Sequence, residues 1–249
     1  QESERALRHL ERTIQAEGSD SVAAILLETI PGTAGVLVPP PGYLAGVREI
    51  ADHYGIVFIL DEVMAGFARA GEWFAFDAFD VTPDLITFAK GVNSGYVPLG
   101  GVVISDEIAR TFDDRVFPGG LTYSGHPLAA ASAVATIEAM ADENIVEHAA
   151  RMGTDILGPR LREIAERHAV VGEVRGRGVF WAVELVADRQ TREPLGAERM
   201  AALKKDLLDQ GLLGFFAENR LHVVPPAVVT ESELDRGLTI IDAALGRLG

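Results

Sequence analysis

Three short apolar runs, each closely followed by a polar residue, constrain the fold of this chain more than any other feature. They are VAAILL at 22–27, IVFIL at 56–60 and LITF at 85–88. Continuous apolar runs this short are typical of parallel strands covered on both faces, and helical or irregular segments separate them here. In open α/β sheets the ligand crevice lies at the carboxyl ends of the strands. Glu28, Asp61 and Lys90 follow these ends, so we predict an α/β fold with a candidate site there.

The rest of the pattern divides the chain into two parts. Spacing and breakers predict a fourth strand at 102–104 and two strand pairs after residue 170, joined by glycine-rich turns. Helices are predicted at 1–17, 42–54, 128–140, 144–168, 197–210 and 231–248. We therefore predict part of a large α/β domain over residues 1–145 and a smaller C-terminal α+β domain over 146–249.

Composition excludes several classes of function. The chain carries 37 acidic and 22 basic side chains, a formal charge of −15, which disfavours binding to nucleic acid through a general basic field. It has no cysteine, and its six histidines show no zinc-site spacing, so no metal site is predicted. No apolar run is long enough to cross a bilayer, and the N-terminal stretch is charged. We expect a cytoplasmic protein with neither nucleic acid nor membrane as a partner.

Lys90 and Asp61 are the two residues with the clearest chemical potential. A lysine at a strand end among apolar neighbours can lose its charge through desolvation and become the nucleophilic amine that Schiff-base chemistry requires. A carboxylate at Asp61 could keep a pyridine nitrogen protonated, so that the ring acts as an electron sink. The alternatives are a solvated loop lysine at Lys90 and a helix cap or arginine partner at Asp61. Glu62 adjoins Asp61, but neighbours in an extended segment point in opposite directions, which argues against a shared role.

A long ordered motif surrounds these residues. The run ILDEVMAGFARAGEWFAFDAFDVTPDLITFAKGVNSGYVPLGGVVIS resembles the core signature of the class III aminotransferases, pyridoxal-phosphate enzymes of fold type I. The resemblance extends from about Ala16 to the C-terminus. It implies a fold-type I large domain with a mostly parallel sheet, incomplete in this chain, followed by a smaller C-terminal domain.

The resemblance also assigns roles to individual residues. It implies that Lys90 holds pyridoxal phosphate as a Schiff base and later moves a proton between substrate and cofactor. Asp61 pairs with the pyridine nitrogen, and Val63 packs on one face of the ring. Thr122, in GGLTYSGHP, reaches a cofactor phosphate across a dimer interface, its alternative being a turn residue that satisfies local backbone. Glu28 lies over the cofactor and offsets a substrate-binding arginine.

The chain departs from the family pattern at several places. Met64 stands where many members have a glutamine that contacts the cofactor's phenolic oxygen. Phe215 and His222 occupy the two positions where members that accept carboxylates place an arginine. Arg220 is then the candidate for the substrate carboxylate, against the alternative of a surface arginine in a tight turn. The glycine- and serine-containing phosphate loop and the stacking aromatic residue of the family's N-terminal part have no match, so we expect the C-terminal portion of a longer enzyme.

These features lead to one preferred function and two alternatives. The preferred function is ping-pong transfer of an amino group from an ω-amino acid or primary amine to a small oxo acid such as pyruvate, in a homodimer with shared active sites. One alternative is an aminomutase of the glutamate-1-semialdehyde type, which shares the aspartate and lysine motifs. The other is a non-catalytic fragment that acts as a dimerisation partner.

Overall fold

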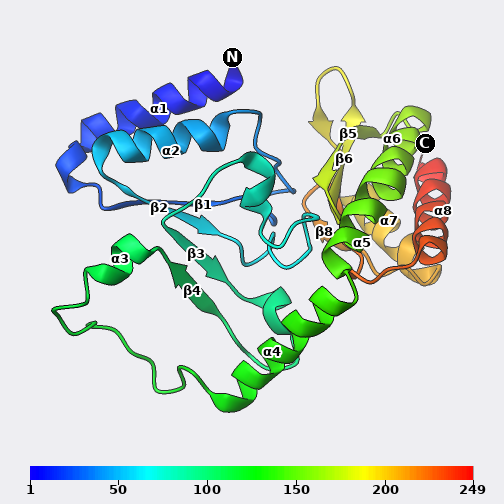
Figure 1. Ribbon diagram of the computed structural model, residues 1–249. Helices are drawn as coiled ribbons and strands as arrows, with labels where there is room; N and C mark the ends of the chain where they lie inside the picture. The colour runs from blue at the N-terminus through cyan, green and yellow to red at the C-terminus, as the bar shows by residue number, and fades with distance from the viewer. Residues whose placement is uncertain (249) are drawn as a thin grey trace. The chain divides into compact units, whose positions relative to one another are not determined.

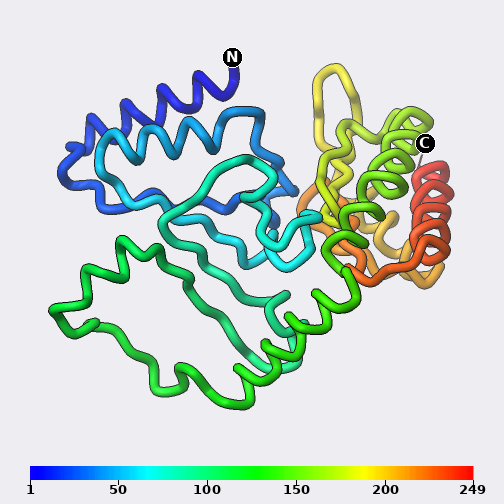
Figure 2. Tube along the Cα trace, in the orientation of Figure 1, coloured from blue at the N-terminus to red at the C-terminus, as the bar shows by residue number. Residues whose placement is uncertain are grey.

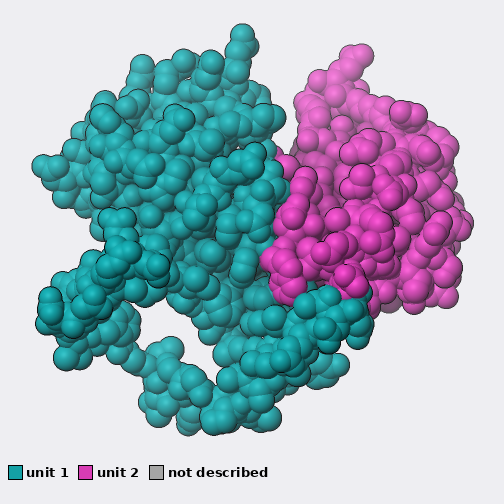
Figure 3. All heavy atoms as spheres, in the orientation of Figure 1, with its two compact units in different colours: residues 1–30, 39–67, 74–143 teal, residues 31–38, 68–73, 144–249 magenta. Residues whose placement is uncertain are grey.

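The computed structural model describes residues 1–248 and divides into two compact units (Figure 3). Unit 1 consists of Gln1–Ile30, Pro39–Phe67 and Phe74–Glu143. Unit 2 consists of Pro31–Val38, Ala68–Trp73 and the described residues from Asn144 onward. The two short segments at 31–38 and 68–73 thus interrupt unit 1 in sequence while packing within unit 2.

Unit 1 is built on the sheet β1-β2-β3-β4 (Figure 1). Strands β1, β2 and β3 are parallel, and β4 runs antiparallel to β3. The strands are β1 (Ala24–Glu28), β2 (Val57–Asp61), β3 (Leu85–Phe88) and β4 (Gly101–Ile104). The α-helices are α1 (Glu2–Glu17), α2 (Tyr43–Tyr54), α3 (Asp106–Arg110) and α4 (Pro127–Asp142). Single 3₁₀ turns are η1 (Ser19–Ser21), η2 (Ala75–Phe79) and η3 (Lys90–Asn93).

Helices α1 and α2 cover one face of this sheet. They lie side by side, and their apolar residues form one core with the inward positions of β1 and β2 (Figure 1). Along β1 and β2 buried and more exposed residues alternate, with Ile25, Phe58 and Leu60 on the helix side. The opposite face holds Leu26, which is 60% exposed, and it also holds the last residues of both strands. The candidate site therefore lies on the sheet face that the helices leave open.

Unit 2 contains an antiparallel sheet of order β5-β6-β9-β8, with β7 paired to β6. The strands are β5 (Val171–Arg177), β6 (Phe180–Asp188), β7 (Glu193–Pro194), β8 (Phe215–Ala217) and β9 (Arg220–Val223). The helices are α5 (Ile145–Arg151), the π-helical turn η4 (Met152–Leu157), α6 (Gly158–Arg167), α7 (Ala197–Asp209) and α8 (Glu231–Leu248), which Figure 2 traces in order. Residues of α6, α7 and α8 pack with one face of the sheet into a second core.

The structure confirms an α/β fold with a mostly parallel sheet and a separate antiparallel sheet. Two details differ from the sequence-based expectation. Glu28 and Asp61 are the last residues of their strands rather than the residues after them. The helix expected at 144–168 contains a π-helical turn. The fourth strand, for which no direction was predicted, runs antiparallel to β3. Within residues 1–248, no helix is long and apolar enough to cross a membrane.

Candidate functional site

Glu28, Asp61 and Thr87 form a row across the carboxyl ends of the three parallel strands. Glu28 pairs in register with Asp61, and Asp61 pairs with Thr87. Paired residues of parallel strands share a face, so all three side chains project to the face opposite α1 and α2. The hydroxyl of Thr87 is buried and has no hydrogen-bond partner. Because a buried hydroxyl without a partner costs free energy, it marks a place where a polar ligand atom would be stabilised.

A local turn orients the carboxylate of Asp61. Its Oδ1 accepts a hydrogen bond of 2.9 Å from the backbone N–H of Val63. This bond from an aspartate to the residue two positions later is typical of an Asx turn, which fixes the side chain at the end of the strand. The side chains of Asp61, Val63 and Met64 are each partly exposed.

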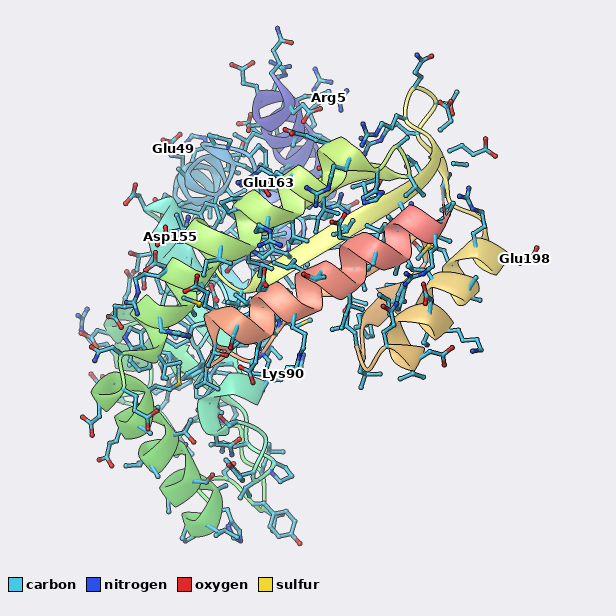
Figure 4. All side chains as sticks on the ribbon, turned by 90° about the vertical axis from the view of Figure 1, so that its right-hand side faces the viewer. Arg5, Glu49, Lys90, Asp155, Glu163 and Glu198 are labelled. Carbon is cyan, nitrogen blue, oxygen red and sulfur yellow. The ribbon has the colours of Figure 1, made fainter. Side chains whose placement is uncertain are left out.

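Lys90 begins the turn η3 that directly follows β3. Its backbone has φ 44°, in the left-handed region that residues other than glycine rarely adopt. Such strain persists only where the surroundings impose it, and it clusters at functional sites. The side chain is exposed, so the described residues do not supply the apolar burial that the sequence suggested (Figure 4).

Glu62 differs from its neighbour Asp61 in burial and in hydrogen-bond partners. It is 0% exposed and accepts hydrogen bonds from the hydroxyl of Thr29 and from the N–H groups of Ala75 and Phe76. Burial raises the pKa of Glu62, and the three hydrogen bonds oppose that rise. The opposite orientations of Asp61 and Glu62 agree with the separate roles predicted from their adjacency. The partners of Glu62 cannot be predicted from the sequence pattern, because Thr29 and Ala75 are distant from it along the chain.

Thr122 lies in the exposed turn near the start of α4. The turn is closed by a backbone hydrogen bond from Ser124 to Leu121, and the Thr122 side chain is exposed. Among the described residues of unit 1, the structure does not bring Thr122 into the row formed by Glu28, Asp61 and Thr87. Its proposed role depends on a second subunit, as the sequence resemblance implies.

Arg220 and His222 belong to unit 2, on the face of its sheet away from the helical core. They alternate along β9 with Leu221 and Val223, which pack into that core. The Nη2 of Arg220 donates to Glu218 at 2.6 Å, and its Nε is buried without a partner. Arg220 is therefore not the surface arginine of the alternative reading, because its side chain is only 17% exposed.

His222 is 4% exposed, and its Nε2 has no hydrogen-bond partner. The ring of Phe215 meets it edge to face at 5.1 Å. Burial lowers the pKa of His222, and the charges on Arg220 and Arg175 lower it further. The lowered pKa favours the neutral form of His222, at one of the two positions where the family resemblance implies an arginine.

The row and Lys90 together fit pyridoxal phosphate in part. A carboxylate at one strand end suits a protonated ring nitrogen, a primary amine at the next suits an aldehyde, and the unpartnered Thr87 hydroxyl adds a polar contact. Donors for the phosphate are not assembled in the described part of unit 1, where Thr122 stays exposed. No group of three or more potential metal ligands occurs among residues 1–248, which leaves the prediction of no metal site as a prediction.

Comparison with known proteins gives the family. The family model for aminotransferase class-III matches residues 1–245, and the chain belongs to this family. It is 39% identical to a taurine–pyruvate aminotransferase of Rhodobacter capsulatus over 98% of this chain and 56% of that protein. It is 40% identical to a putrescine–pyruvate aminotransferase of Pseudomonas aeruginosa over 94% of this chain and 52% of that protein.

A solved structure is similar throughout. The taurine:2-oxoglutarate aminotransferase of Bifidobacterium kashiwanohense, determined in complex with PLP and glutamate, superposes with a TM-score of 0.95 at 44% identity. The match covers 98% of this chain and 56% of that one. The family predicted from the motif around Lys90 is therefore confirmed, and the chain spans about half the length of the relatives it matches.

Proposed function

We propose that this chain forms part of a pyridoxal-phosphate-dependent aminotransferase that moves an amino group from an ω-amino acid or primary amine to a small oxo acid such as pyruvate. The observation that carries the proposal is the placement of Asp61 at the end of β2 and of Lys90 just beyond the end of the adjacent parallel strand β3. The taurine–pyruvate and putrescine–pyruvate relatives support the substrate classes, since both names describe a terminal amine and pyruvate.

In this proposal Asp61, Lys90, Val63 and Met64 have distinct tasks. Pyridoxal phosphate, when bound, supplies an aldehyde that condenses with primary amines and a ring that accepts an electron pair. Asp61, already oriented by the Val63 N–H, holds a proton on the ring nitrogen. The Nζ of Lys90 would hold the cofactor and, when free of it, would act as general base and acid at the substrate carbon. Val63 and Met64 would contact the ring, and neither could donate a side-chain hydrogen bond to it.

Substrate recognition in the proposal involves Glu28 and Arg220. Arg220 binds the anionic end of the donor or acceptor, and its buried Nε without an acceptor supports this assignment. A substrate anion would compete with Glu218 for the guanidinium. Glu28 keeps the role that the family resemblance implies, that of an acidic residue over the cofactor.

The finer architecture belongs to the same proposal. Residues 1–145 would be part of a fold-type I large domain and residues 146–249 the small domain, supported by the two units and the change of sheet type. A homodimer would allow Thr122 of one subunit to serve the phosphate of the other. The cytoplasmic location and the absence of nucleic-acid and membrane partners remain predictions from composition.

Reductive trapping tests the proposal. The chain, completed to the length of its relatives, is incubated with pyridoxal phosphate, reduced with borohydride, digested and analysed by mass spectrometry. We expect the cofactor on Lys90, and in Lys90→Ala a loss of activity of at least about a thousandfold. A folded protein modified at no lysine would refute the catalytic role and favour a dimerisation partner. An amino shift within one molecule, without a second oxo acid, would favour the aminomutase.

A further inference from the structure

Glu62 connects three segments of unit 1 through one buried carboxylate. Its Oε1 accepts from the Thr29 hydroxyl at 2.6 Å and from the Phe76 N–H at 3.0 Å, and its Oε2 accepts from the Ala75 N–H at 2.9 Å. Thr29 follows the end of β1, Glu62 follows the end of β2, and Ala75 begins η2. The carboxylate thus fixes the two strand ends that bear Glu28 and Asp61 to the segment at 74–79.

A chain of aromatic contacts leads from this segment to the turn of Lys90. Phe74, next to Ala75, packs edge to face on Phe67 with ring centres 5.3 Å apart, and Phe67 packs in the same way on Phe88 of β3 at 5.9 Å. Phe67 also lies against the backbone of Gly91, where an added methyl group would be 2.6 Å from the Phe67 Cβ. Only glycine allows this approach, so the residue after Lys90 is fixed by the Phe67 side chain.

We propose that Glu62 is a positioning residue, which holds the Lys90 turn in register with Asp61 through Ala75, Phe74 and Phe67. The inference rests on the proposed function, since it gives Glu62 a role in a site composed of Asp61 and Lys90. The strained backbone of Lys90, with φ 44°, is the kind of conformation that such surroundings must maintain. The Glu62 carboxylate touches neither substrate nor cofactor in this proposal and acts through its neighbours.

The three hydrogen-bond donors favour the ionised carboxylate of Glu62 as the form that holds these segments together. Every partner of Glu62 donates, so the carboxylate with both oxygens accepting satisfies all of them, whereas a glutamine would direct its own N–H₂ group at a donor. Burial raises the pKa of Glu62, and Asp77 adds a smaller effect in the same direction. The hydrogen bonds favour the ionised form, and their loss would leave buried donors without acceptors.

Three substitutions separate positioning from simple stability. Glu62→Gln disturbs the whole cluster, Thr29→Val removes one hydroxyl donor with little change of shape, and Thr29→Ser retains that donor. The matched control is Glu49→Gln, the same chemical change at an exposed position of α2 (Figure 4). We expect cofactor binding to weaken about tenfold in Thr29→Val and further in Glu62→Gln, because a hydrogen bond to a buried charged group is lost. Thr29→Ser and the control stay within about twofold of the parent.

Two readouts besides activity decide the question in the completed protein. The first is the pH midpoint of the absorbance of the bound cofactor. With the turn loosened, this midpoint should move toward the value measured for pyridoxal phosphate with a lysine ester in buffer. The second is amide hydrogen exchange of residues 75–76 and 91–93, which should rise together in Glu62→Gln and Thr29→Val. A stabilising role alone would reduce the folded fraction and leave the midpoint of the remaining loaded protein unchanged.

The outcomes distinguish this inference from the proposed function. If the parent protein takes no cofactor on Lys90, the proposed function fails, and the exchange of 91–93 still tests the connection from Glu62. If the parent is loaded but Glu62→Gln and Thr29→Val keep its midpoint and its exchange at 91–93, the positioning role is overturned. If both readouts change in Glu62→Gln and Thr29→Val but keep the parent values in Thr29→Ser, the positioning role is supported.

Discussion

His222 gives unit 2 a stability that depends on pH. Its folded-state pKa is lowered by burial and by the charges on Arg220 and Arg175, whereas the unfolded chain has a histidine near 6.5. Between these two values the unfolded state binds a proton that the folded state does not. Stability is therefore full above about pH 6.5 and is lost as the pH falls from there through the folded-state pKa.

Replacement of His222 by glutamine should remove the pH-dependent contribution of this side chain to the free energy of unfolding. Relative to the parent, the slope of unfolding free energy against pH below about 6.5 should decrease, by no more than about 1.4 kcal/mol per pH unit for one proton. Denaturant titrations at a series of pH values measure the slope. His9→Gln, at an exposed position of α1, provides the control and should keep the parent slope. Equal slopes in the parent and His222→Gln would contradict the assignment.

At the scale of elements, two helical glycines should respond oppositely to the same substitution. Gly153 lies in the π-helical turn η4, where a methyl group would be 2.1 Å from the backbone oxygen of Gly178. The contact is with backbone atoms, so it can be relieved only by a backbone shift. We therefore expect Gly153→Ala to lower the free energy of unfolding by about 3 kcal/mol or more. At Gly237 in α8 the nearest atom to a methyl group would be 3.7 Å away. Gly237→Ala should therefore stabilise by up to about 1 kcal/mol.

Thermal unfolding of the two variants beside the parent provides the measurement. The pair controls for the general effect of alanine in a helix, because both positions are glycines in helical segments of the same unit. A Gly153→Ala protein with the parent's transition temperature would contradict this prediction, since the contact with Gly178 would then relax at little cost.

The elements that the sequence predicts well are those with a local cause. The apolar run LITF matches β3 residue for residue, because the continuous apolar character lies in the strand's own residues. The helix before Gly55 ends at Tyr54, because the glycine that ends it is the next residue. In the π-helical turn Gly153 closely approaches Gly178, which is distant in sequence, and no helical periodicity reveals this contact. The antiparallel direction of β4 is likewise set by pairing with β3.

The candidate site also contains residues with local sequence signals and residues without them. Strand ends and the long motif predict Asp61 and Lys90, and the strand register aligns Glu28 and Thr87 with Asp61. The buried carboxylate of Glu62 could not be paired from sequence, since its donors lie 33 and 13 residues away at Thr29 and Ala75. The sequence shows only that Glu62 is an acidic residue next to a strand end, and this position does not indicate whether its side chain is buried.

At the scale of the whole molecule, the proposed homodimer makes a prediction that a single subunit cannot satisfy. Thr122 is exposed and lies outside the row in its own unit, and a symmetric dimer would place it at the neighbouring site in both directions. Thr122→Glu should abolish cofactor binding, because its carboxylate would repel the phosphate. Lys90→Ala should be inactive for a different reason, the loss of the amine.

Mixing the two inactive variants tests whether the sites are shared. In a mixed dimer, the subunit with Thr122→Glu keeps Lys90 and would receive an intact Thr122 from its partner, so one of its two sites would be complete. After unfolding and refolding together, half of the dimers are mixed, and we expect about a quarter of the parent activity. If Thr122 serves its own subunit, no site in any dimer is complete, and the mixture stays inactive. Restored activity from two inactive proteins would therefore require both the dimer and the exchange of Thr122 between its subunits.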